Sequence, residues 1–336
     1  MTGTSSGSAV AQPAGSPGTV RVTAWRAGSA WEADGLEEVE RLLADPGVRL
    51  WVDVSSDDHA NADAAARLLG LHPLIVEDIA ERNQRAKLEE TDGQLHLVLF
   101  ALAYAGAVHE LEVDLVLGER TLLTVHDPGW DPFALPQLRA GAGHLLARGP
   151  DFLLYTLADG IVDAYFPVLD RLGDELDAVQ DDVIAHASSW TLERLFDLKR
   201  ELIGLRRAIA PAREIFNQLT NRDLERIAPA HVVYFRDVYD HLIRATDELD
   251  TDRELVGGTL EVYLSTVNNN LSAIMKRLTG VTVILAGMGA LAGIFGMSEA
   301  GPALAFAEAG GFWLVTAIIA AGAAMTALVL RRIDWI

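Results

Sequence analysis

Hydroxyl-bearing and very small side chains recur in and just before a strongly apolar stretch near the C-terminal end of this 336-residue chain. They follow one another at alternating intervals of three and four residues, which places them along one face of a helix. This polar stripe consists of Asn268, Ser272, Met275, Thr279, Thr282, Ala286, Gly289 and Gly293. Polar side chains at hydrocarbon depth are tolerated where they face protein or a water-filled cavity rather than lipid. The chemistry such a face could offer is hydrogen bonding to water or to a hydrated ion.

A second stripe, one residue earlier in the sequence, has the same spacing and is apolar. Its members are Leu260, Leu264, Val267, Leu271, Ile274, Leu278, Val281, Leu285, Met288, Ala292 and Phe295. This heptad pattern is typical of helices packed lengthwise. A chain with only two membrane-spanning helices cannot by itself enclose a water-filled path. A pore would therefore require several copies of the chain around an axis. The alternative is a tight helix interface, for which Gly289 and Gly293 supply a G-x-x-x-G pair.

A pore lined by the polar stripe would have an apolar entrance and a weakly polar interior. Met275 and Leu278 lie near its inner end, where apolar rings can close a channel by dewetting. Thr279 and Thr282 offer hydroxyls further in, and Gly293 exposes backbone carbonyl surface. No carboxylate lies inside the span. We therefore expect an ion that keeps much of its water shell, which suits Mg²⁺ because it dehydrates reluctantly.

Two segments are long and apolar enough to cross a bilayer. Residues 278–298 and 309–330 carry no charged side chain, and each reaches the roughly 20 residues that a span requires. Basic residues flank both spans and are absent from the loop between them: Lys276, Arg277, Arg331 and Arg332. The positive-inside rule then places both termini in the cytoplasm and the loop outside. The alternative, a buried helical hairpin in a soluble core, fits poorly with segments that are apolar on all sides.

The preceding region predicts a long rod joined to a mixed domain. No proline occurs between Pro229 and Pro302, and an unbroken helix over most of that distance would reach about 100 Å. Short β-rich runs alternate with helical patterns before residue 126, and helices are expected over 151–187 and 190–219, with a kink or break at Pro211. The predicted organisation is a disordered tail at 1–19, an α/β cytosolic domain with a helical hairpin at 20–228, a stalk helix at 229–277, transmembrane helices at 278–298 and 310–330, an outward loop at 299–309 and a cytosolic tail at 331–336.

Composition narrows the function classes. The formal charge of −21 and the pI near 4.7 argue against a nucleic-acid partner and favour attraction of cations. The chain has no cysteine, and its first 19 residues lack the pattern of a signal peptide. No nucleophile and base stand at a catalytic spacing, so an enzyme is not predicted.

His241 lies one helical turn from Asp237, but an ordinary exposed pair is the preferred interpretation. The acidic run from Asp170 to Asp182 is likewise interpreted as a solvated face rather than a cation site.

Several characteristic stretches occur in a fixed order along the chain. The C-terminal ones are "NNNLSAIMKRLTGVTVILAGMGALAGIFGMS", a short acidic loop, a second span and "RRIDWI". Upstream, the matching stretches are "HPLIVEDIAERNQRAKLEE", "LLYTLADGIVDAYFPVLD", "LKRELIGLRRAIAPAREIF" and "YFRDVYDHLIRATDELD". In this order these stretches resemble the CorA family of magnesium transport proteins, and the resemblance covers nearly everything after residue 20.

The resemblance implies a funnel-shaped homopentamer in a bacterial plasma membrane that passes Mg²⁺ and, in some members, Co²⁺ or Ni²⁺, with Zn²⁺ in a related branch. Gly296, Met297 and Ser298 occupy the positions of the family's Gly-Met-Asn triplet at the outer mouth. Met275 matches an inner constriction. Asp237 matches a regulatory Mg²⁺ ligand between subunits, and Asp92 falls near its expected partner.

This chain departs from the family pattern at three pore positions. Ser298 replaces the signature Asn, Ser272 replaces a common second pore Asn, and Ala286 stands where a bulky apolar residue is frequent. Serine keeps a donor and acceptors but reaches less far than asparagine. The expected function is passive, Mg²⁺-gated influx of a divalent cation, most readily Mg²⁺. The alternatives are a Zn²⁺ or Co²⁺/Ni²⁺ transporter of the same fold, or a membrane cation sensor or scaffold that does not conduct.

Overall fold

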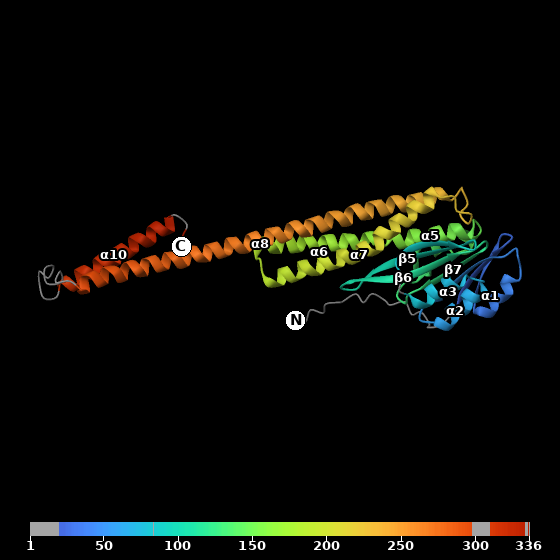
Figure 1. The fold of residues 1–336 in the computed structure, drawn as a ribbon, viewed down its shortest axis with the longest axis horizontal. Helices are drawn as coiled ribbons and strands as arrows, with labels where there is room; N and C mark the ends of the chain where they lie inside the picture. The colour runs from blue at the N-terminus through green and yellow to red at the C-terminus, as the bar shows by residue number, and fades with distance from the viewer. Residues whose placement is uncertain (1–19, 83, 298–309, 333–334, 336) are drawn as a thin grey trace, which may run out of the picture. The chain divides into compact units, whose positions relative to one another are not determined.

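The computed structural model describes residues 20–82, 84–297, 310–332 and 335. The chain divides into two units (Figure 1). The first consists of Met1–Ala178 with Arg194–Val256, and the second of Val179–Glu193 with Gly257–Ile336. The predicted disordered tail at 1–19 and the outward loop at 299–309 lie outside the described residues.

The first unit is built on one mixed seven-stranded sheet with the order β2-β1-β3-β7-β6-β5-β4. The strands are β1 (Arg21–Arg26), β2 (Ser29–Asp34), β3 (Arg49–Ser55), β4 (Lys87–Thr91), β5 (Gln94–Tyr104), β6 (Val108–Leu117) and β7 (Thr121–His126). Only β3 and β7 pair in parallel, and the other neighbours are antiparallel. The expected partly antiparallel sheet is confirmed. The edge strands β2 and β4 are not predicted from the sequence, because their polar residues give little hydrophobic signal.

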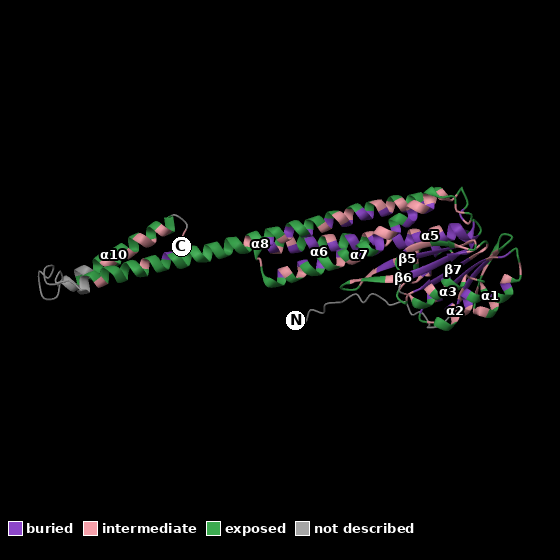
Figure 2. Ribbon diagram, viewed as in Figure 1, coloured by how far each residue is buried: buried purple, intermediate pink, exposed green. Residues whose placement is uncertain are grey.

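Helices cover the sheet on both faces. On one face α1 (Leu36–Leu43), α2 (His59–Leu68) and α3 (Pro73–Glu81) pack against strand residues such as Val52 and Val125. On the other face α5 (Pro150–Asp163) contacts β3, β5, β6 and β7. With both faces covered, the central strands are buried along most of their length, as Figure 2 shows.

The turn between β4 and β5 consists of two residues, Asp92 and Gly93. Both have positive φ, 50° and 72°, and Thr91 pairs with Gln94 on either side of them. A two-residue hairpin turn of this kind favours Asp-Gly, because these residues tolerate the left-handed region. Asp92 therefore has a structural role in the turn, whatever else it does.

Three helical stretches complete the α-helical part before the long rod. They are the short α4 (Gly143–Leu146) with two 3-10 turns (Pro132–Ala134 and Pro136–Leu138), then α6 (Tyr165–Ala185) and α7 (Ser189–Asn221). The helical stretch expected over 151–187 is interrupted only at Ala164, the single residue between α5 and α6. Of the kink or break expected at Pro211, the break is absent, since α7 runs through this residue. Buried Ala208, Ala212 and Ile215 around Pro211 supply packing that offsets the lost backbone hydrogen bond.

The predicted long helix is confirmed. Helix α8 runs unbroken from Val232 to Met297, and its 66 residues correspond to about 100 Å at about 1.5 Å per residue. Helix α10 (Gly310–Arg332) has 23 residues and ends on two arginines.

Among the described residues, two helical stretches are long and apolar enough to cross a membrane. The first, Pro150–Ala185, is 67% buried over its most apolar window and is a core element of the soluble fold. The second, Val232–Ile294, is 6% buried there. The segment predicted as the second span coincides with α10, which has no charged residue between Gly310 and Leu330.

Candidate functional site

The C-terminal part of α8 leaves a long run of apolar side chains exposed (Figure 2). Each of these residues is at least 36% accessible: Leu264, Val267, Leu271, Ile274, Met275, Leu278, Val281, Val283, Leu285, Met288, Leu291 and Ile294. Soluble monomers rarely expose continuous apolar surface of this length, because water disfavours it. This part of α8 therefore needs lipid or other protein chains around it.

The polar stripe lies on α8 as the spacing predicted. All its members belong to this single helix, so the alternation of three and four keeps them on one face with a slow drift. From Met275 to Gly296 the helix rises by 21 residues, about 32 Å at about 1.5 Å per residue. That length matches the roughly 30 Å of a bilayer's hydrocarbon core. The stripe is thus long enough to line a path across a membrane.

Thr282 shows how a hydroxyl is accommodated on this face. Its Oγ1 donates a 2.8 Å hydrogen bond to the Leu278 carbonyl one turn earlier. The hydroxyl's own donor is therefore satisfied inside the helix, and only its acceptor lone pairs remain available. A hydrated cation presents water hydrogens outward, so an acceptor is the polarity that such an ion requires.

Gly289 and Gly293 lie on open surface. A Cβ added at either glycine would meet no described atom within 4 Å outside its own helix backbone. Within the described part of the chain the G-x-x-x-G pair is therefore not used as an interface. The surface remains free either for close approach of another copy or for a solute.

The structure describes the two apolar residues of the proposed entrance but only part of the proposed outer mouth. Met275 is 54% exposed and Leu278 is 59% exposed, so neither is held in a core. Gly296 and Met297 form the end of α8. Ser298, the third residue of the triplet, lies outside the described residues.

A second candidate site joins α5 and α8 within the first unit. One ligand atom from each of Asp159, Asp163 and His241 lies within 4.8 Å of the others. Nδ1 of His241 is 2.9 Å from Oδ1 of Asp163. Asp159 has a buried carboxylate oxygen, Oδ1, with no hydrogen-bond partner. The grouping of oxygen and imidazole donors is one that divalent cations bind.

The cluster of Asp159, Asp163 and His241 also has an excess of negative charge. Burial is the main cause that raises the pKa of Asp159 from 3.8 to about 6, and the nearby carboxylates of Asp163 and Asp237 raise it further, while His241 opposes them. Burial also raises the pKa of Tyr155 to about 12, again with contributions from these carboxylates. Crowded carboxylates that resist ionisation are stabilised when a cation binds between them.

The sequence predicts only part of this cluster. It singles out Asp237 and His241 but not Asp159 and Asp163. The available signal was the i,i+4 spacing of both pairs on two predicted helices. Asp92, the suggested partner of Asp237, instead lies in the β4–β5 turn with an 81% exposed side chain, 3.9 Å from Nε2 of His72. Among the described residues no hydrogen bond or ion pair joins Asp92 to Asp237.

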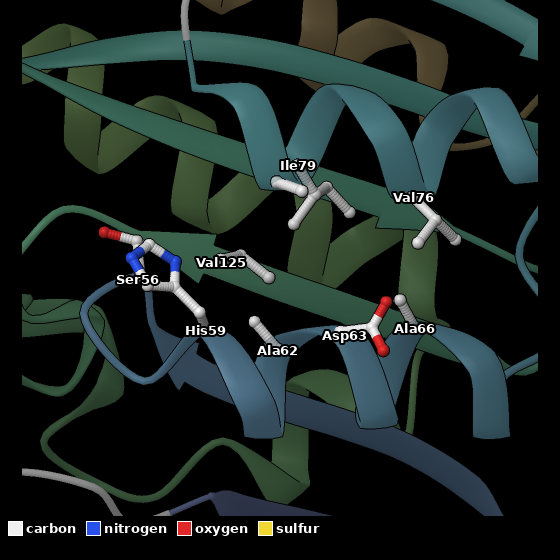
Figure 3. Close-up of a pocket in the computed structure, with 9 residues that line it drawn as sticks. Ser56, His59, Ala62, Asp63, Ala66, Val76, Ile79 and Val125 are labelled. Atoms are coloured by element: carbon white, nitrogen blue, oxygen red, sulfur yellow. The ribbon is translucent and has the colours of Figure 1, made fainter.

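A small cavity between α2 and α3 is a poor candidate for a ligand site (Figure 3). Its volume of about 30 Å³ suits one water molecule. Its walls are mostly apolar, including Ala62, Val76 and Ile79, with His59 and Asp63 also among its lining residues.

Comparison with known proteins places these features in one family. A family model described as CorA-like Mg²⁺ transporter protein matches residues 47–332. The cobalt/magnesium transport protein CorA of Thermotoga maritima is 32% identical over 308 residues, covering 89% of this chain and 87% of that protein. A putative metal ion transporter of Bacillus subtilis is 29% identical over 261 residues, covering 77% and 82%.

Solved structures give the same fold. The complete CorA magnesium transporter from Methanocaldococcus jannaschii superposes with a TM-score of 0.77 at 21% identity, covering 94% of this chain and 99% of that one. The full-length CmaX protein superposes with a TM-score of 0.74 at 22% identity, covering 96% and 100%. The soluble α/β domain, the long helix and the second apolar helix are therefore a known arrangement.

Proposed function

Because this chain belongs to the CorA-like family of Mg²⁺ transporters, we propose that it is a divalent cation channel that carries Mg²⁺ passively into the cell. The observation that carries the proposal is the polar stripe on α8, flanked by exposed apolar side chains over a membrane-spanning length. A helix with one polar edge and otherwise apolar surroundings is suited to contact water on one side and lipid or protein on the others.

The proposed assembly is a homopentamer in a bacterial plasma membrane, with both termini in the cytoplasm. Identical copies of α8 would place their polar stripes around one axis, and α10 would contact lipid. The charge distribution supports this orientation, since Lys276, Arg277, Arg331 and Arg332 lie at one end of the two spans. A closed ring satisfies the exposed face of every copy in the same way.

In this assembly the ion passes with most of its water shell. Ser298 and the backbone at Gly296 would receive it at the outer mouth, and Thr282, Thr279 and Ser272 would accept hydrogen bonds from its waters. Gly289, Gly293 and Ala286 would leave room for a hydrated ion. Met275 and Leu278 would form the apolar constriction that closes the inner end. Without a carboxylate in the span, tight binding of a bare ion is not favoured.

Gating is proposed to depend on Mg²⁺ bound in the cytosolic part. Asp237 would share an ion with the neighbouring subunit, and Asp92 is retained as a candidate for the partner ligand because its exposed side chain is free to meet another copy. Asp159 and Asp163 extend the same acidic surface within one chain. Bound Mg²⁺ would offset carboxylate repulsion and hold the subunits closed, and its loss would let the constriction wet.

The direct test is flux in proteoliposomes containing the purified full-length chain. We expect entry of Mg²⁺ down its gradient, and strong loss of flux in Gly289→Leu, because a leucine would fill the lumen. The matched control is Gly287→Leu, which adds the same side chain two residues away on a different face. Equal flux in both variants, with assembly intact, would contradict the pore.

The preferred ion needs a separate test because Ser298 replaces an asparagine. Competition among Mg²⁺, Co²⁺, Ni²⁺ and Zn²⁺ in the same proteoliposomes measures the selectivity. Ser298→Asn should shift it toward Mg²⁺ if the outer mouth discriminates. The remaining candidate is a sensor or scaffold that keeps the fold without conducting. Absence of flux of all four ions through correctly assembled protein would favour that candidate.

A further inference from the structure

We propose a transition-metal site at the sheet edge of the first unit, formed by Asp78 of α3, Glu89 of β4 and His96 of β5. One ligand atom from each of these residues lies within 4.8 Å of the others. The site involves neither α8 nor the acidic cluster on α5. It would bind Zn²⁺, Co²⁺ or Ni²⁺, and it stands independently of the proposed channel function.

The fold brings the three side chains together for simple geometric reasons. Glu89 and His96 are directly opposite each other in the β4–β5 pair, so their side chains project from the same face of the sheet. Asp78 comes from α3, whose Ile75 and Ile79 are anchored in the core on one face of the sheet. The position of each donor is therefore set by regular secondary structure rather than by a loop.

The surroundings of His96 leave one of its ring nitrogens available as a metal ligand. Its side chain is fully buried, and Nε2 lies 2.7 Å from Oδ1 of Asp114. A carboxylate acceptor at Nε2 favours the tautomer that carries its proton there. Nδ1 then holds a lone pair, and it has no hydrogen-bond partner. A buried acceptor without a donor is unfavourable, and a metal ion in front of it would remove that cost.

The ligand set selects among cations. One imidazole with two carboxylates suits Zn²⁺, Co²⁺ and Ni²⁺, whereas Mg²⁺ prefers oxygen ligands and its own waters. Ligands on a tetrahedral ion with bonds of about 2.1 Å are about 3.4 Å apart. The three donors lie within 4.8 Å of one another, so rotations of Asp78 and Glu89, whose side chains are 20% and 50% exposed, would complete the coordination.

Lys87 occupies the same place in the structure described here. Its Nζ lies 2.6 Å from Asp78 and 3.1 Å from Glu89. The ammonium supplies one positive charge to two carboxylates but makes no hydrogen bond to Nδ1 of His96, which remains unpartnered. A divalent ion would satisfy all three groups, and Lys87 would move to solvent. Lys87 is therefore expected to compete with the metal.

The experiment measures binding of Co²⁺ and Zn²⁺ to the detergent-purified full-length chain. The background is Asp163→Asn with His241→Gln, which removes the other described group of histidine and carboxylate donors. Co²⁺ bound through imidazole gains visible absorption relative to the hydrated ion, and competition with a chelating dye gives the Zn²⁺ affinity. We expect a Co²⁺ spectrum with nitrogen ligation and Zn²⁺ binding that a large excess of Mg²⁺ does not displace.

Variants distinguish metal binding at this site from nonspecific attraction of cations to an acidic protein. Glu89→Gln should weaken Zn²⁺ binding by about tenfold or more, while Glu90→Gln, one residue along the strand, should leave it unchanged. Lys87→Met should tighten binding. His96→Phe should abolish the nitrogen signature, and folding is checked by thermal unfolding. Equal Zn²⁺ affinities in Glu89→Gln and Glu90→Gln, or no nitrogen ligation of Co²⁺ in the background protein and in Lys87→Met, would overturn the proposal.

Discussion

Nδ1 of His241 on α8 lies 2.9 Å from Oδ1 of Asp163 on α5, although 78 residues separate them in the chain. This contact connects the N-terminal part of the long helix to a helix packed on the sheet. Asp159, one turn before Asp163, brings a third donor within reach. A cation bound here would hold α5 and α8 together, and α8 is the helix that carries the polar stripe.

Removing one carboxylate from this cluster should weaken stabilisation by Mg²⁺. In the unaltered protein we expect the melting temperature to rise with added Mg²⁺, held by the carboxylates of Asp159 and Asp163 and by its own waters without His241 as a ligand, since an ion that binds only the folded state contributes about 2.7 kcal/mol at one hundred times its Kd. Asp163→Asn should lose most of that rise, as measured by thermal unfolding in detergent. Asp174→Asn on the exposed face of α6 is the control. If both variants respond to Mg²⁺ like the unaltered protein, the cluster does not bind the ion.

Gating at Asp237 can be examined separately from binding. Asp237→Ala should leave the open channel able to conduct but make uptake less sensitive to internal Mg²⁺, because the proposed bridge between subunits is lost. The measurement is initial Mg²⁺ uptake into proteoliposomes preloaded with increasing Mg²⁺. Asp92→Asn tests the suggested partner in the same assay. Unchanged inhibition by internal Mg²⁺ in Asp237→Ala would refute this gating role.

The pKa of Asp159 makes the Mg²⁺ response depend on pH. Burial and neighbouring carboxylates raise that pKa from 3.8 to about 6, so the folded protein holds a proton that the unfolded chain releases at lower pH. Without metal, the contribution of Asp159 to stability therefore falls as pH rises from about 4 to about 6. Mg²⁺ must displace this proton, so stabilisation by Mg²⁺ should grow between pH 5 and about pH 7. Asp159→Asn should flatten that pH dependence, and thermal unfolding at a series of pH values would reveal it.

The fold was readable from sequence where a single physical signal dominates. The absence of proline from 232 to 297 and the two uncharged apolar runs specify long helices regardless of tertiary contacts. The edge strand β4, "KLEET", was missed because its polar residues have almost no hydrophobic periodicity, and it exists because β5 supplies hydrogen bonds. Pro211 does not break α7 for the related reason that buried neighbours keep the helix intact.

The candidate sites were predictable to different degrees. The polar stripe needs only one helix, so spacing alone located it. The Asp163–His241 contact depends on which helices pack together, and the meeting of His96, Glu89 and Asp78 depends on strand register. Neither is encoded in local spacing. The buried polar network around Arg82, which binds Asp114 and Asp127, is likewise a product of sheet order.

Glu112 gives a second test of pH dependence within this buried network. Burial is the main cause that raises its pKa from 4.5 to about 7, with repulsion from Asp114 and Asp127 adding to it and Arg82 opposing it. The folded protein thus loses stability as pH rises from about 4.5 to about 7, since ionisation of Glu112 is less favourable when folded. Glu112→Gln should be more stable than the unaltered chain by about 2 kcal/mol at pH 8 and gain little at pH 5. Denaturant unfolding at the two pH values measures the difference, and an equal gain at both would exclude titration of Glu112 as its cause.

Thr282 provides the most direct test of the polar stripe, because α10 contains a matched threonine. Oγ1 of Thr282 donates to the carbonyl four residues earlier at 2.8 Å, and Oγ1 of Thr326 does the same at 2.9 Å. Thr→Val at either position removes a hydroxyl and keeps the shape, so the effects on helix stability should be alike and small. Only Thr282 is proposed to accept hydrogen bonds from the waters of a passing ion. Thr282→Val should therefore lower Mg²⁺ flux several-fold in proteoliposomes, whereas Thr326→Val should conduct like the unaltered protein. Equal flux through both variants would mean that this face of α8 does not contact the ion.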